Sequence, residues 1–411
     1  MIDKIGKNLV FLLCVPRSGS SLSTILLQNH SKVLATQEMW YLMSLYDLKR
    51  PENRPYGGKR IISRFFNGMV TDKAFVDSAR AFALETYNGL LHSSNASLIV
   101  DKSPRYYYIL EFIDRLFPES KRIWLIRNPL SILASYKKVN QNKKAFSLIE
   151  ELSKPTFNIK IVDLTVGFFR YYDYFSTDHP QAIRLSYERL VTNPKYEVEK
   201  LCEFLNVSYE EGMERYGDQL DSSKGRMFAS MGVGDPNVYE HSKAHTDSIE
   251  IWKDLLTKEE IEAYCRLLGA NVFRELGYEK ELQEAEKITG AHFEKEPDHE
   301  FIQKVRKQFL NNSETEWEEA YHMQAVQSAD FSHVTTDEEH PSDSRQELLN
   351  EIQQMNITIK TLEQRLATNL TEKTKLMQEL QSVRTRFNRF KSLIPFSGFL
   401  TNLAEQRGQK K

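Results

Sequence analysis

The residues with the clearest chemical pattern lie at 16–21, where the sequence reads Pro-Arg-Ser-Gly-Ser-Ser. An apolar run at 9–15 precedes them and is typical of a buried parallel strand, and a helical spacing of apolar residues follows them. A strand, a short loop and a helix start bring backbone N–H groups and the positive end of the helix dipole to one point. The stretch therefore predicts a binding site for an anion, in the first place a phosphate.

The side chains of this loop support an anion site. Gly19 lets the backbone come close to a ligand, and the hydroxyls of Ser20 and Ser21 can donate hydrogen bonds. Arg17 adds a fixed cation that can donate two parallel hydrogen bonds to phosphate oxygens. The loop lacks the lysine and the length of G-x-x-x-x-G-K-[ST], so the sequence disfavours a standard Mg-nucleotide site. An ordinary turn whose serines cap the helix is the alternative.

Polar residues follow each further strand predicted in the first part of the chain. The apolar runs at 33–36, 98–100 and 122–126 each lead into a polar turn and then a helical pattern. This alternation predicts an α/β fold, a P-loop-like parallel sheet flanked by helices, whose loops converge at one edge. Glu38, which follows the second strand, would then lie beside the phosphate loop. Stabilisation of a helix N-terminus is an equally good role for Glu38.

The composition disfavours several classes of protein. The 411 residues are 40% hydrophobic and 27% charged, with a formal net charge of −2, so no overall basic field favours nucleic acid. No apolar stretch approaches the ~20 residues of a membrane span. The apolar run near the N-terminus has no cleavage site after it, which argues against secretion. Three cysteines without metal-ligand spacing, Cys14, Cys202 and Cys265, fit a reducing compartment, and we expect a cytoplasmic protein.

The chain changes character after residue 280. We expect a globular domain at 1–280, an acidic linker at 281–344 that is partly helical or disordered, a coiled coil at 345–393, and a basic, aromatic tail at 394–411. Between Leu348 and Phe390, residues at alternating steps of four and three follow the heptad pattern of a coiled coil. This C-terminal coiled-coil helix predicts a homo-oligomer. A long helix packed on the globular domain is the alternative.

The end of the chain combines basic residues with aromatic and aliphatic ones. Two interpretations stay open for this tail. It is an interfacial amphipathic segment attracted to anionic lipid, or it is the frayed end of the coiled coil. The first interpretation adds peripheral contact with the inner face of the membrane to an otherwise cytoplasmic protein.

Taken together, these motifs resemble those of the sulfotransferases that use 3′-phosphoadenosine 5′-phosphosulfate, in particular the bacterial and carbohydrate-type members. In that family a Pro-[Lys/Arg]-Ser-Gly-[Ser/Thr] loop between a strand and a helix holds the 5′-phosphosulfate, and residues 16–21 match it. A second hallmark is a strand that ends in Arg, with a Ser eight residues later, and Arg127 and Ser135 match it. These two residues are implied to hold the 3′-phosphate. The resemblance covers about residues 8–278.

The resemblance implies a role for each residue of the site. The residues implied to bind the co-substrate are Arg17, Ser18, Gly19, Ser20, Ser21, Arg127, Ser135 and Tyr187, the last of them near the adenine. Lys102 is implied to lie near the transferred sulfuryl group, with Arg17 as a second catalytic cation. No metal is expected, because fixed cations and loop amides can stabilise the charge on the leaving phosphate. A base must take the proton of the acceptor, and Glu38 is the residue we expect to do so.

Two departures from the family pattern bear on these roles. Cytosolic small-molecule members use a His two residues after the lysine that matches Lys102, and Pro104 stands at that position here. Bacterial and carbohydrate-type members often use a Glu in the region of Glu38, which is why we expect it to be the base. The cytosolic pattern Arg-Lys-Gly…Gly-Asp-Trp-Lys of the late loop is absent, so the contacts made by residues 224–245 stay open.

The sequence thus predicts an enzyme that moves a sulfuryl group to a hydroxyl or amine acceptor. A coiled coil and a membrane-binding tail would suit a glycan or a lipid-linked saccharide, as in polysaccharide modification, and a small-molecule acceptor stays open. The alternatives are a P-loop nucleotide kinase or NTPase, which would require Mg-ATP and a lysine in the loop, and an inactive coiled-coil scaffold. The presence of Arg17, Lys102, Arg127 and Ser135 argues against the scaffold.

Overall fold

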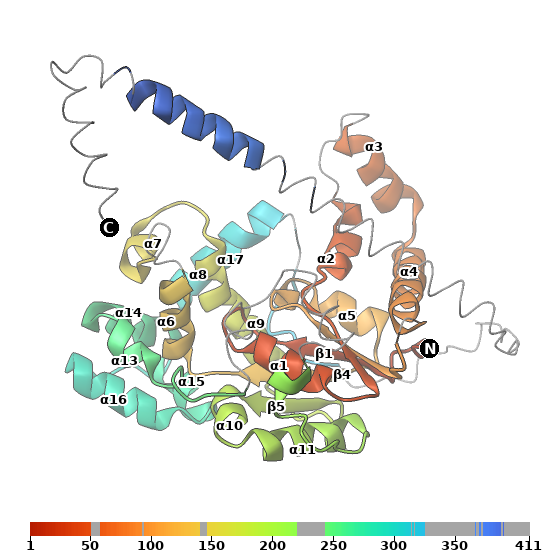
Figure 1. Cartoon of the computed structure of the whole chain (residues 1–411), viewed down its shortest axis with the longest axis horizontal. Helices are drawn as coiled ribbons and strands as arrows, with labels where there is room; N and C mark the ends of the chain where they lie inside the picture. Colours follow the sequence, from red (N-terminus) through yellow and green to blue (C-terminus); the bar gives the residue numbers. More distant parts are fainter. Residues whose placement is uncertain are drawn as a thin grey trace, which may run out of the picture. The chain divides into compact units, whose positions relative to one another are not determined.

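The structure is a computed structural model of the chain (Figure 1). It describes residues 1–50, 58–92, 94–139, 146–219, 243–313, 315, 317–324, 366, 370, 373–387 and 389. The chain divides into two compact units, Met1–Thr336 and Asp337–Lys411. The first unit contains the sheet and all the predicted site residues.

A five-stranded sheet lies at the centre of the first unit, in the order β2-β3-β1-β4-β5. Every strand pairing in this sheet is parallel. The strands are β1 (Leu9–Leu13), β2 (Val33–Ala35), β3 (Leu98–Lys102), β4 (Lys121–Ile126) and β5 (Ala182–Ser186). The predicted P-loop-like parallel sheet flanked by helices is confirmed. Because β1 lies between β3 and β4, the loops that follow these three strands start side by side.

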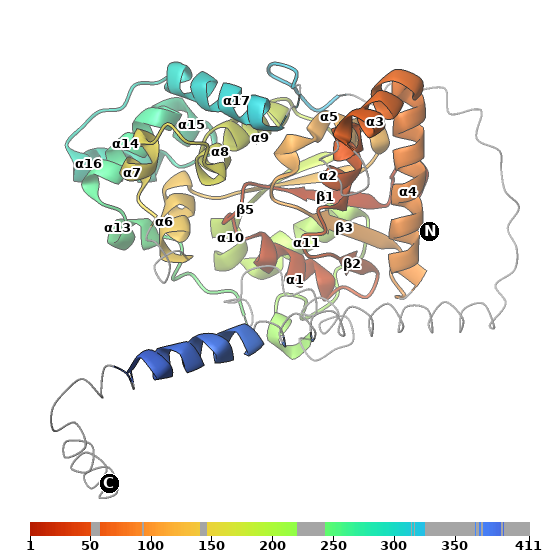
Figure 2. The ribbon, with the colours of Figure 1, turned by 90° about the horizontal axis from the view of Figure 1, so that it is seen from above.

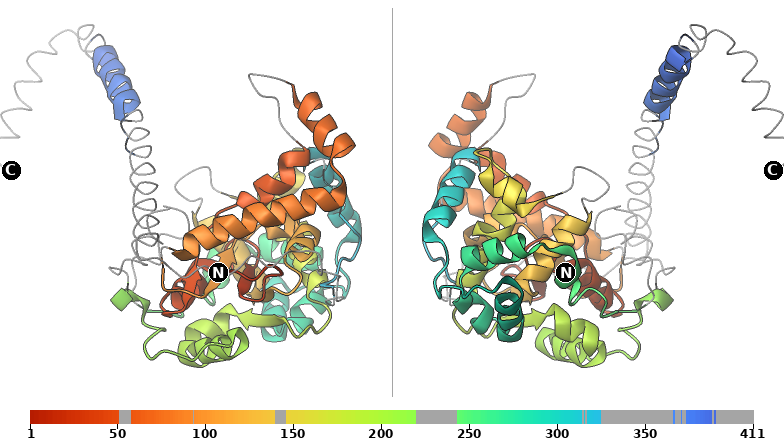
Figure 3. Two further views of the ribbon diagram at one scale, coloured as in Figure 1. Left: turned by 90° about the vertical axis from the view of Figure 1, so that its right-hand side faces the viewer. Right: turned by 90° about the vertical axis from the view of Figure 1, so that its left-hand side faces the viewer.

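The side chains of β1 alternate between two hydrophobic cores, as the pleat of a strand requires. Leu9, Phe11 and Leu13 belong to one core, which they share with α4 and α5, and Val10 and Leu12 belong to the other, which they share with α1 and α11. All five side chains are fully buried. Figure 3 shows α4 and α11 on opposite sides of the sheet. Burial on both faces explains why the sequence of β1 is continuously apolar.

The helices of the first unit cover both faces of the sheet and extend beyond it (Figure 1). They are α1 (Ser20–Gln28), α2 (Tyr41–Tyr46), α3 (Lys59–Arg64), α4 (Asp72–His92), α5 (Leu110–Leu116), α6 (Pro129–Val139), α7 (Leu148–Ser153), α8 (Ile159–Leu164), α9 (Val166–Tyr174), α10 (Tyr187–Thr192), α11 (Pro194–Leu205), α13 (Ile251–Leu255), α14 (Lys258–Leu268), α15 (Ala270–Glu275), α16 (Glu279–Thr289) and α17 (His299–Ser313).

The ends of α6 and α11 follow sequence signals. Pro129 and Pro194 stand at the first positions of these helices, where a fixed φ angle suits the helix and no N–H is required. Asn206 ends α11 in the left-handed conformation, with a φ of 61°. The early start of α6 matters for the site, because it leaves only Arg127 and Asn128 between β4 and the helix that carries Ser135.

The structure has two helices, α16 and α17, where the sequence suggested the start of an acidic linker. Figure 2 shows α17 beside α8 and α9. After α17, Trp317 donates a hydrogen bond from its indole N–H to the Tyr108 carbonyl at 2.9 Å. Its ring stacks on that of Phe309 with centroids 4.7 Å apart. The difference has a physical reason, since a few aromatic side chains bury much apolar area even in an acid-rich segment.

In the second unit, the described residues 373–387 are helical. Leu376, Leu380, Val383 and Phe387, which follow the heptad spacing, are all more than half exposed on this chain. The rest of the predicted coiled coil lies largely, and the tail at 394–411 entirely, outside the described residues, so the coiled coil stays a prediction. Within the described part of the chain, no helix is long and apolar enough to cross a membrane.

Candidate anion-binding and group-transfer site

The loop after β1 has a backbone that few residue types adopt. Gly19 has a φ of 96°, and Arg17, although it carries a side chain, has a φ of 74°. Gly19 is the N-cap of α1 and makes no side-chain capping hydrogen bond. The alternative of a serine-capped turn is therefore not what the structure contains. The first turn of α1 begins with the buried residues Ser20 and Ser21.

Gly19 is required here for space as well as for conformation. A Cβ atom added to it would lie 2.3 Å from Cδ2 of Tyr187. Tyr187 is the first residue of α10, directly after β5, and is 7% exposed. The loop after β1 and the start of α10 therefore touch, which brings two of the predicted site residues together.

Arg17, Arg127 and Ser135 also meet at this point. Nε of Arg17 donates to Oγ of Ser135 at 3.1 Å, and Nη1 of Arg127 donates to the carbonyl of Arg17 at 2.9 Å. The guanidinium carbon of Arg127 lies 4.2 Å from the centroid of the Tyr187 ring. The spacing of eight residues between Arg127 and Ser135, noticed in the sequence, thus brings both residues into contact with Arg17.

Arg127 is held almost entirely inside the protein, at 5% exposure. Burial lowers the pKa of its guanidinium, an effect that Arg17 adds to and that Tyr187 and Glu188 oppose. Its Nη2 donates to the carbonyl of Ser248 at 2.7 Å, while its buried Nε has no hydrogen-bond partner among the described residues. A buried cation with an unused donor is costly unless an acceptor completes it, which is what an anionic ligand would do.

Glu188 connects the ends of β4 and β5, a role the sequence did not reveal. One carboxylate oxygen accepts a hydrogen bond from the backbone N–H of Asn128 at 2.8 Å. The other accepts from the hydroxyls of Ser186, at 3.0 Å, and Tyr278, at 2.8 Å. Glu188 therefore holds in place the two segments that carry Arg127 and Tyr187. Arg127 directly precedes Asn128, and Tyr187 lies between Ser186 and Glu188. Its place directly after Tyr187 is the only signal that the sequence offered.

Lys102 and Glu38 form the second half of the site. Lys102 is the last residue of β3, its side chain is fully buried, and its Nζ lies 3.3 Å from Oε1 of Glu38. It also donates to Oε1 of Gln37 at 3.4 Å. Glu38 itself keeps about a fifth of its side chain exposed, at 21%. The pair therefore places a buried cation in contact with a carboxylate that solvent or a ligand can reach.

Asp101, which precedes Lys102 on β3, is completely buried among tyrosines. Its Oδ2 accepts hydrogen bonds from the hydroxyls of Tyr87, at 2.6 Å, and Tyr106, at 2.9 Å. Burial raises the pKa of Asp101 to about 6, although both hydrogen bonds and the neighbouring Lys102 act in the opposite direction. The end of β3 is thus anchored by a carboxyl group with an unusual affinity for its proton.

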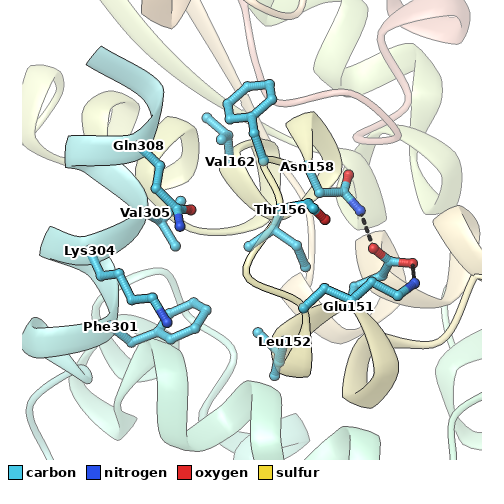
Figure 4. A pocket seen from close by; sticks show the side chains of 12 residues that line it. Glu151, Leu152, Thr156, Asn158, Val162, Phe301, Lys304, Val305 and Gln308 are labelled. Carbon is cyan, nitrogen blue, oxygen red and sulfur yellow. Dashed lines mark hydrogen bonds and ion pairs between the residues drawn. The ribbon is translucent and has the colours of Figure 1, made fainter. Parts of the chain in front are cut away.

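A separate pocket lies between α7, α8 and α17 (Figure 4). Glu151 on one wall accepts hydrogen bonds from Asn158 and Lys154, both at 2.6 Å, and Val305 and Gln308 of α17 face it from the other wall. None of the residues that line this pocket belongs to the predicted site. Its polar groups on the first wall are already paired with one another.

Two further expectations can be placed only in part. Of the late loop, 224–245, only residues 243–245 are described, and the carbonyl of Lys243 accepts a hydrogen bond from the hydroxyl of Tyr216 at 3.2 Å. The described residues contain no group of three or more His, Cys, Asp or Glu side chains that could hold a metal ion. Cys14 lies within the core under the loop, where burial raises the pKa of its thiol to about 12.

Comparisons with known proteins match the part of the chain that holds most of this site. A family model described as Sulfotransferase family matches residues 10–211. The chain is 29% identical over 287 residues to the nodulation protein NoeE of Sinorhizobium fredii, an alignment that covers 67% of each chain. It is 24% identical to a putative protein-tyrosine sulfotransferase of Caenorhabditis briggsae, over 64% of this chain and 89% of the relative. Among solved structures, the sulfotransferase domain from the curacin biosynthetic pathway aligns with a TM-score of 0.44 at 24% identity, over 66% of this chain and 97% of that one.

Proposed function

We propose that this chain, whose residues 10–211 match a family model described as Sulfotransferase family, transfers a sulfuryl group from 3′-phosphoadenosine 5′-phosphosulfate to a hydroxyl group of a saccharide acceptor. The observation that carries the proposal is the contact among Arg17, Arg127 and Ser135 at the ends of two adjacent strands. Two cations beside an uncapped helix N-terminus suit a ligand that carries phosphate groups at two positions of one nucleoside.

The residues present fit this donor. The loop with Gly19, an N-cap without a side-chain capping hydrogen bond, leads into the first turn of α1, a helix N-terminus that suits the 5′-phosphosulfate. The unpartnered Nε of Arg127 offers a donor for the 3′-phosphate, with Ser135 two turns along α6. Tyr187 is the proposed adenine contact, which its place between the loop and Arg127 supports.

The transfer step needs a base for the proton of the acceptor and positive charge near the sulfuryl group and the leaving phosphate. Glu38 would take the proton of the acceptor hydroxyl while the oxygen–sulfur bond forms. The bond from sulfur to the 5′-phosphate oxygen breaks, and its electron pair stays on that phosphate. Lys102 and Arg17 would stabilise the developing charge, as preorganised cations do in a site that excludes water. The 3.3 Å contact between Lys102 and Glu38 places the proposed base and one cation at the same point.

The choice of a saccharide hydroxyl is the finer part of the proposal. The relatives named above include a nodulation protein and protein-tyrosine sulfotransferases, so their names alone leave phenolic and other acceptors as alternatives. An amine and a small-molecule alcohol are the remaining alternatives. A saccharide is favoured by the surface beside Glu38, which is described in the next subsection.

We also propose that the chain is cytoplasmic and assembles through its C-terminal helix. The described cysteines are all free and buried, as expected for a reducing compartment. The apolar heptad side chains of residues 373–387 are exposed on a single chain and would be covered in a coiled coil. Peripheral binding of the tail to the inner face of a membrane remains an additional proposal, to be tested with anionic vesicles.

A direct assay tests the proposed function. The purified full chain is incubated with the donor and with oligosaccharides, tyrosine peptides or simple alcohols, and mass spectrometry follows acceptor sulfation while chromatography follows release of adenosine 3′,5′-bisphosphate. We expect transfer to a saccharide hydroxyl. Lys102→Met should reduce transfer at least a hundredfold, in line with the loss of one charge-stabilising group. Lys195→Met, at a half-exposed lysine of α11, is the matched control.

Phosphoryl transfer from Mg-ATP without any sulfuryl transfer would contradict the proposal and would favour the nucleotide-kinase alternative. Binding of the donor without transfer to any hydroxyl or amine would contradict it as well, in favour of an inactive scaffold.

A further inference from the structure

Trp40 is an unusual residue at the edge of the proposed site. It ends the loop that follows β2 and precedes α2, and it has a φ of 60°, a left-handed conformation that bulky residues rarely adopt. It is also 42% exposed, although burial of a tryptophan side chain is strongly favourable. A strained backbone that presents a large aromatic ring to solvent points to a function at this position.

Two contacts tie Trp40 to the proposed catalytic groups. Its indole Nε1 donates to Oε2 of Glu38 at 3.1 Å, while the other carboxylate oxygen of Glu38 faces Lys102 at 3.3 Å. The guanidinium carbon of Arg105 lies over the ring, 5.7 Å from its centroid. A continuous series of contacts therefore runs from the fully buried Lys102 through Glu38 to the exposed ring of Trp40, which Arg105 contacts in turn.

Arg105 is itself held rigidly. Its Nε and Nη2 donate to the carboxylate of Asp163, at 3.0 Å to Oδ1 and 2.8 Å to Oδ2. Asp163 is fully buried and also accepts hydrogen bonds from the hydroxyls of Tyr107 and Tyr136, both at 2.8 Å. A bidentate ion pair with a saturated carboxylate leaves Arg105 little freedom, so it can serve as a fixed support for the Trp40 ring.

We propose that Trp40 is the acceptor-binding platform of this enzyme, on which a sugar ring stacks with one hydroxyl directed at Glu38, and that its indole N–H holds the Glu38 carboxylate in place. This inference rests on the proposed function and specifies the acceptor. Trp40 combines an apolar face with a polar edge, the combination that recognises a sugar ring with its aliphatic C–H faces and polar rim.

The geometry favours a sugar over a tyrosine side chain as the occupant. Because the indole N–H lies in the plane of its ring, the Glu38 oxygen that accepts its hydrogen bond lies near that plane too. A ring stacked on Trp40 would lie about 3.5–4.0 Å above it. A phenol oxygen stays in the plane of its own ring and so remains beyond the roughly 2.6–3.2 Å reach of a base. An axial hydroxyl or a hydroxymethyl group of a sugar leaves the ring plane and can come down to the carboxylate.

The experiment compares Trp40→Ala, Trp40→Phe and wild type in steady-state transfer to tetrasaccharides of glucose, galactose and N-acetylglucosamine and to a tyrosine peptide. Trp40→Ala should raise KM for the saccharide acceptor about tenfold or more, because it removes the ring on which the sugar stacks, and a tenfold change corresponds to about 1.4 kcal/mol. Trp40→Phe keeps a ring but has no N–H. Its KM should return close to that of wild type, while its kcat should stay below that of wild type. Phe82→Ala, an exposed aromatic of α4 at 56% exposure, is the matched control and should change neither constant.

Binding of adenosine 3′,5′-bisphosphate, measured by calorimetry on each variant, shows whether the variant is folded and separates this inference from the proposed function. Unchanged binding together with the KM and kcat changes above supports the platform. Unchanged binding with an unchanged saccharide KM in Trp40→Ala overturns the platform and leaves the proposed function standing. Transfer by wild type to the tyrosine peptide but to none of the saccharides overturns the choice of occupant. Absence of bisphosphate binding by wild type would instead contradict the proposed function.

Discussion

The two halves of the proposed site lie at neighbouring strand ends but are held in place by different kinds of contact. In the donor half, Arg17, Gly19, Arg127 and Ser135, backbone carbonyls take part, since Arg127 donates to those of Arg17 and Ser248 beside the side-chain contact of Arg17 with Ser135. In the acceptor half, Glu38, Trp40, Lys102 and Arg105, side chains hold one another.

This difference has consequences for how each half tolerates change. A backbone-defined pocket keeps its shape when one side chain is replaced, because the carbonyl and N–H groups remain. A series of side chains loses its geometry when any member is removed, because each holds the next. We therefore expect the acceptor half to respond to single substitutions with larger losses in rate, and the donor half with moderate losses in binding.

The largest effect should come from Glu38→Gln, which removes the proposed base with little change in side-chain size. We expect kcat to fall about 10²–10⁴-fold, the usual contribution of general base catalysis. The affinity for adenosine 3′,5′-bisphosphate should stay within about twofold, since Glu38 belongs to the acceptor half, and a twofold change is less than 1 kcal/mol. Rapid-quench kinetics and calorimetry measure both quantities. Glu199→Gln on α11 serves as the control, and a Glu38→Gln variant with full activity would remove Glu38 from the mechanism.

The second prediction concerns the stability of the protein and the buried Asp101, which precedes Lys102 on β3. The pKa of Asp101 is raised from 3.8 to about 6 by burial, so the folded protein holds this proton more tightly than the unfolded chain does. The stabilisation is complete below the unfolded pKa and is lost as the pH rises through about 6, a difference of about 3 kcal/mol. Urea unfolding of wild type and Asp101→Asn between pH 4 and 7 measures it. The difference in free energy of unfolding between wild type and Asp101→Asn should change by about 3 kcal/mol over this pH range.

Asp77 offers a control of opposite sign for that experiment. A hydrogen bond from Lys73 lowers the pKa of this exposed aspartate, so its contribution is present above its ordinary pKa and is lost as the pH falls. Asp77→Asn should therefore differ from wild type mainly at higher pH. Parallel curves for wild type and Asp101→Asn would show that Asp101 does not hold its proton in the folded protein.

A third prediction isolates the donor half. Arg127→Ala should weaken binding of adenosine 3′,5′-bisphosphate about 10–100-fold, since hydrogen bonds to charged groups contribute about 1.5–3 kcal/mol. Binding of adenosine 5′-monophosphate, which lacks the 3′-phosphate, should change little. Calorimetry on both ligands provides the comparison, with Arg189→Ala, at a half-exposed arginine of α10, as the control. Equal losses for the two ligands would contradict the assignment of Arg127 to the 3′-phosphate.

The smallest effect on binding is expected from Gly19→Ala, because this substitution removes no charged donor from the site. The added methyl group would meet Tyr187 at 2.3 Å, and the φ of 96° is unfavourable for alanine. Strain of this kind costs about 1–3 kcal/mol and should reduce bisphosphate affinity about tenfold. Gly89→Ala, in the interior of α4 with open space around the new methyl group, should instead stabilise the protein slightly. An unaffected Gly19→Ala variant would show that the loop rearranges without cost.

The two halves also differ in how far the sequence predicted them. Residues 16–21 form one contiguous motif, and Arg127 and Ser135 lie eight residues apart on a strand end and the helix after it, so their resemblance to two short sulfotransferase motifs sufficed to group them. Trp40, Arg105 and Asp163 were not predicted. Arg105 and Asp163 are 58 residues apart, and no spacing rule links a strand-end loop to a buried aspartate on a distant helix.

The fold shows the same limit. The parallel sheet follows from alternating strand and helix patterns, and its strand ends agree closely with the predicted runs. The segment after residue 280 was expected to be an acidic linker, partly helical or disordered, and the structure adds that α16, α17 and Trp317 pack as part of the first unit. Composition averages over a segment and misses the few aromatic side chains that anchor it. The coiled coil, which depends on a partner chain, stays a prediction.

The central claim is that the donor half binds a nucleoside with phosphates at both the 3′ and the 5′ position. Thermal unfolding of the full chain with adenosine 3′,5′-bisphosphate, with adenosine 5′-monophosphate and with Mg-ATP tests it without knowledge of the acceptor. A ligand at a hundred times its dissociation constant adds about 2.7 kcal/mol to the stability of the native state. The account predicts a clear rise in Tm with the bisphosphate and little change with the other two. A rise with Mg-ATP alone, or equal rises with bisphosphate and monophosphate, would contradict it.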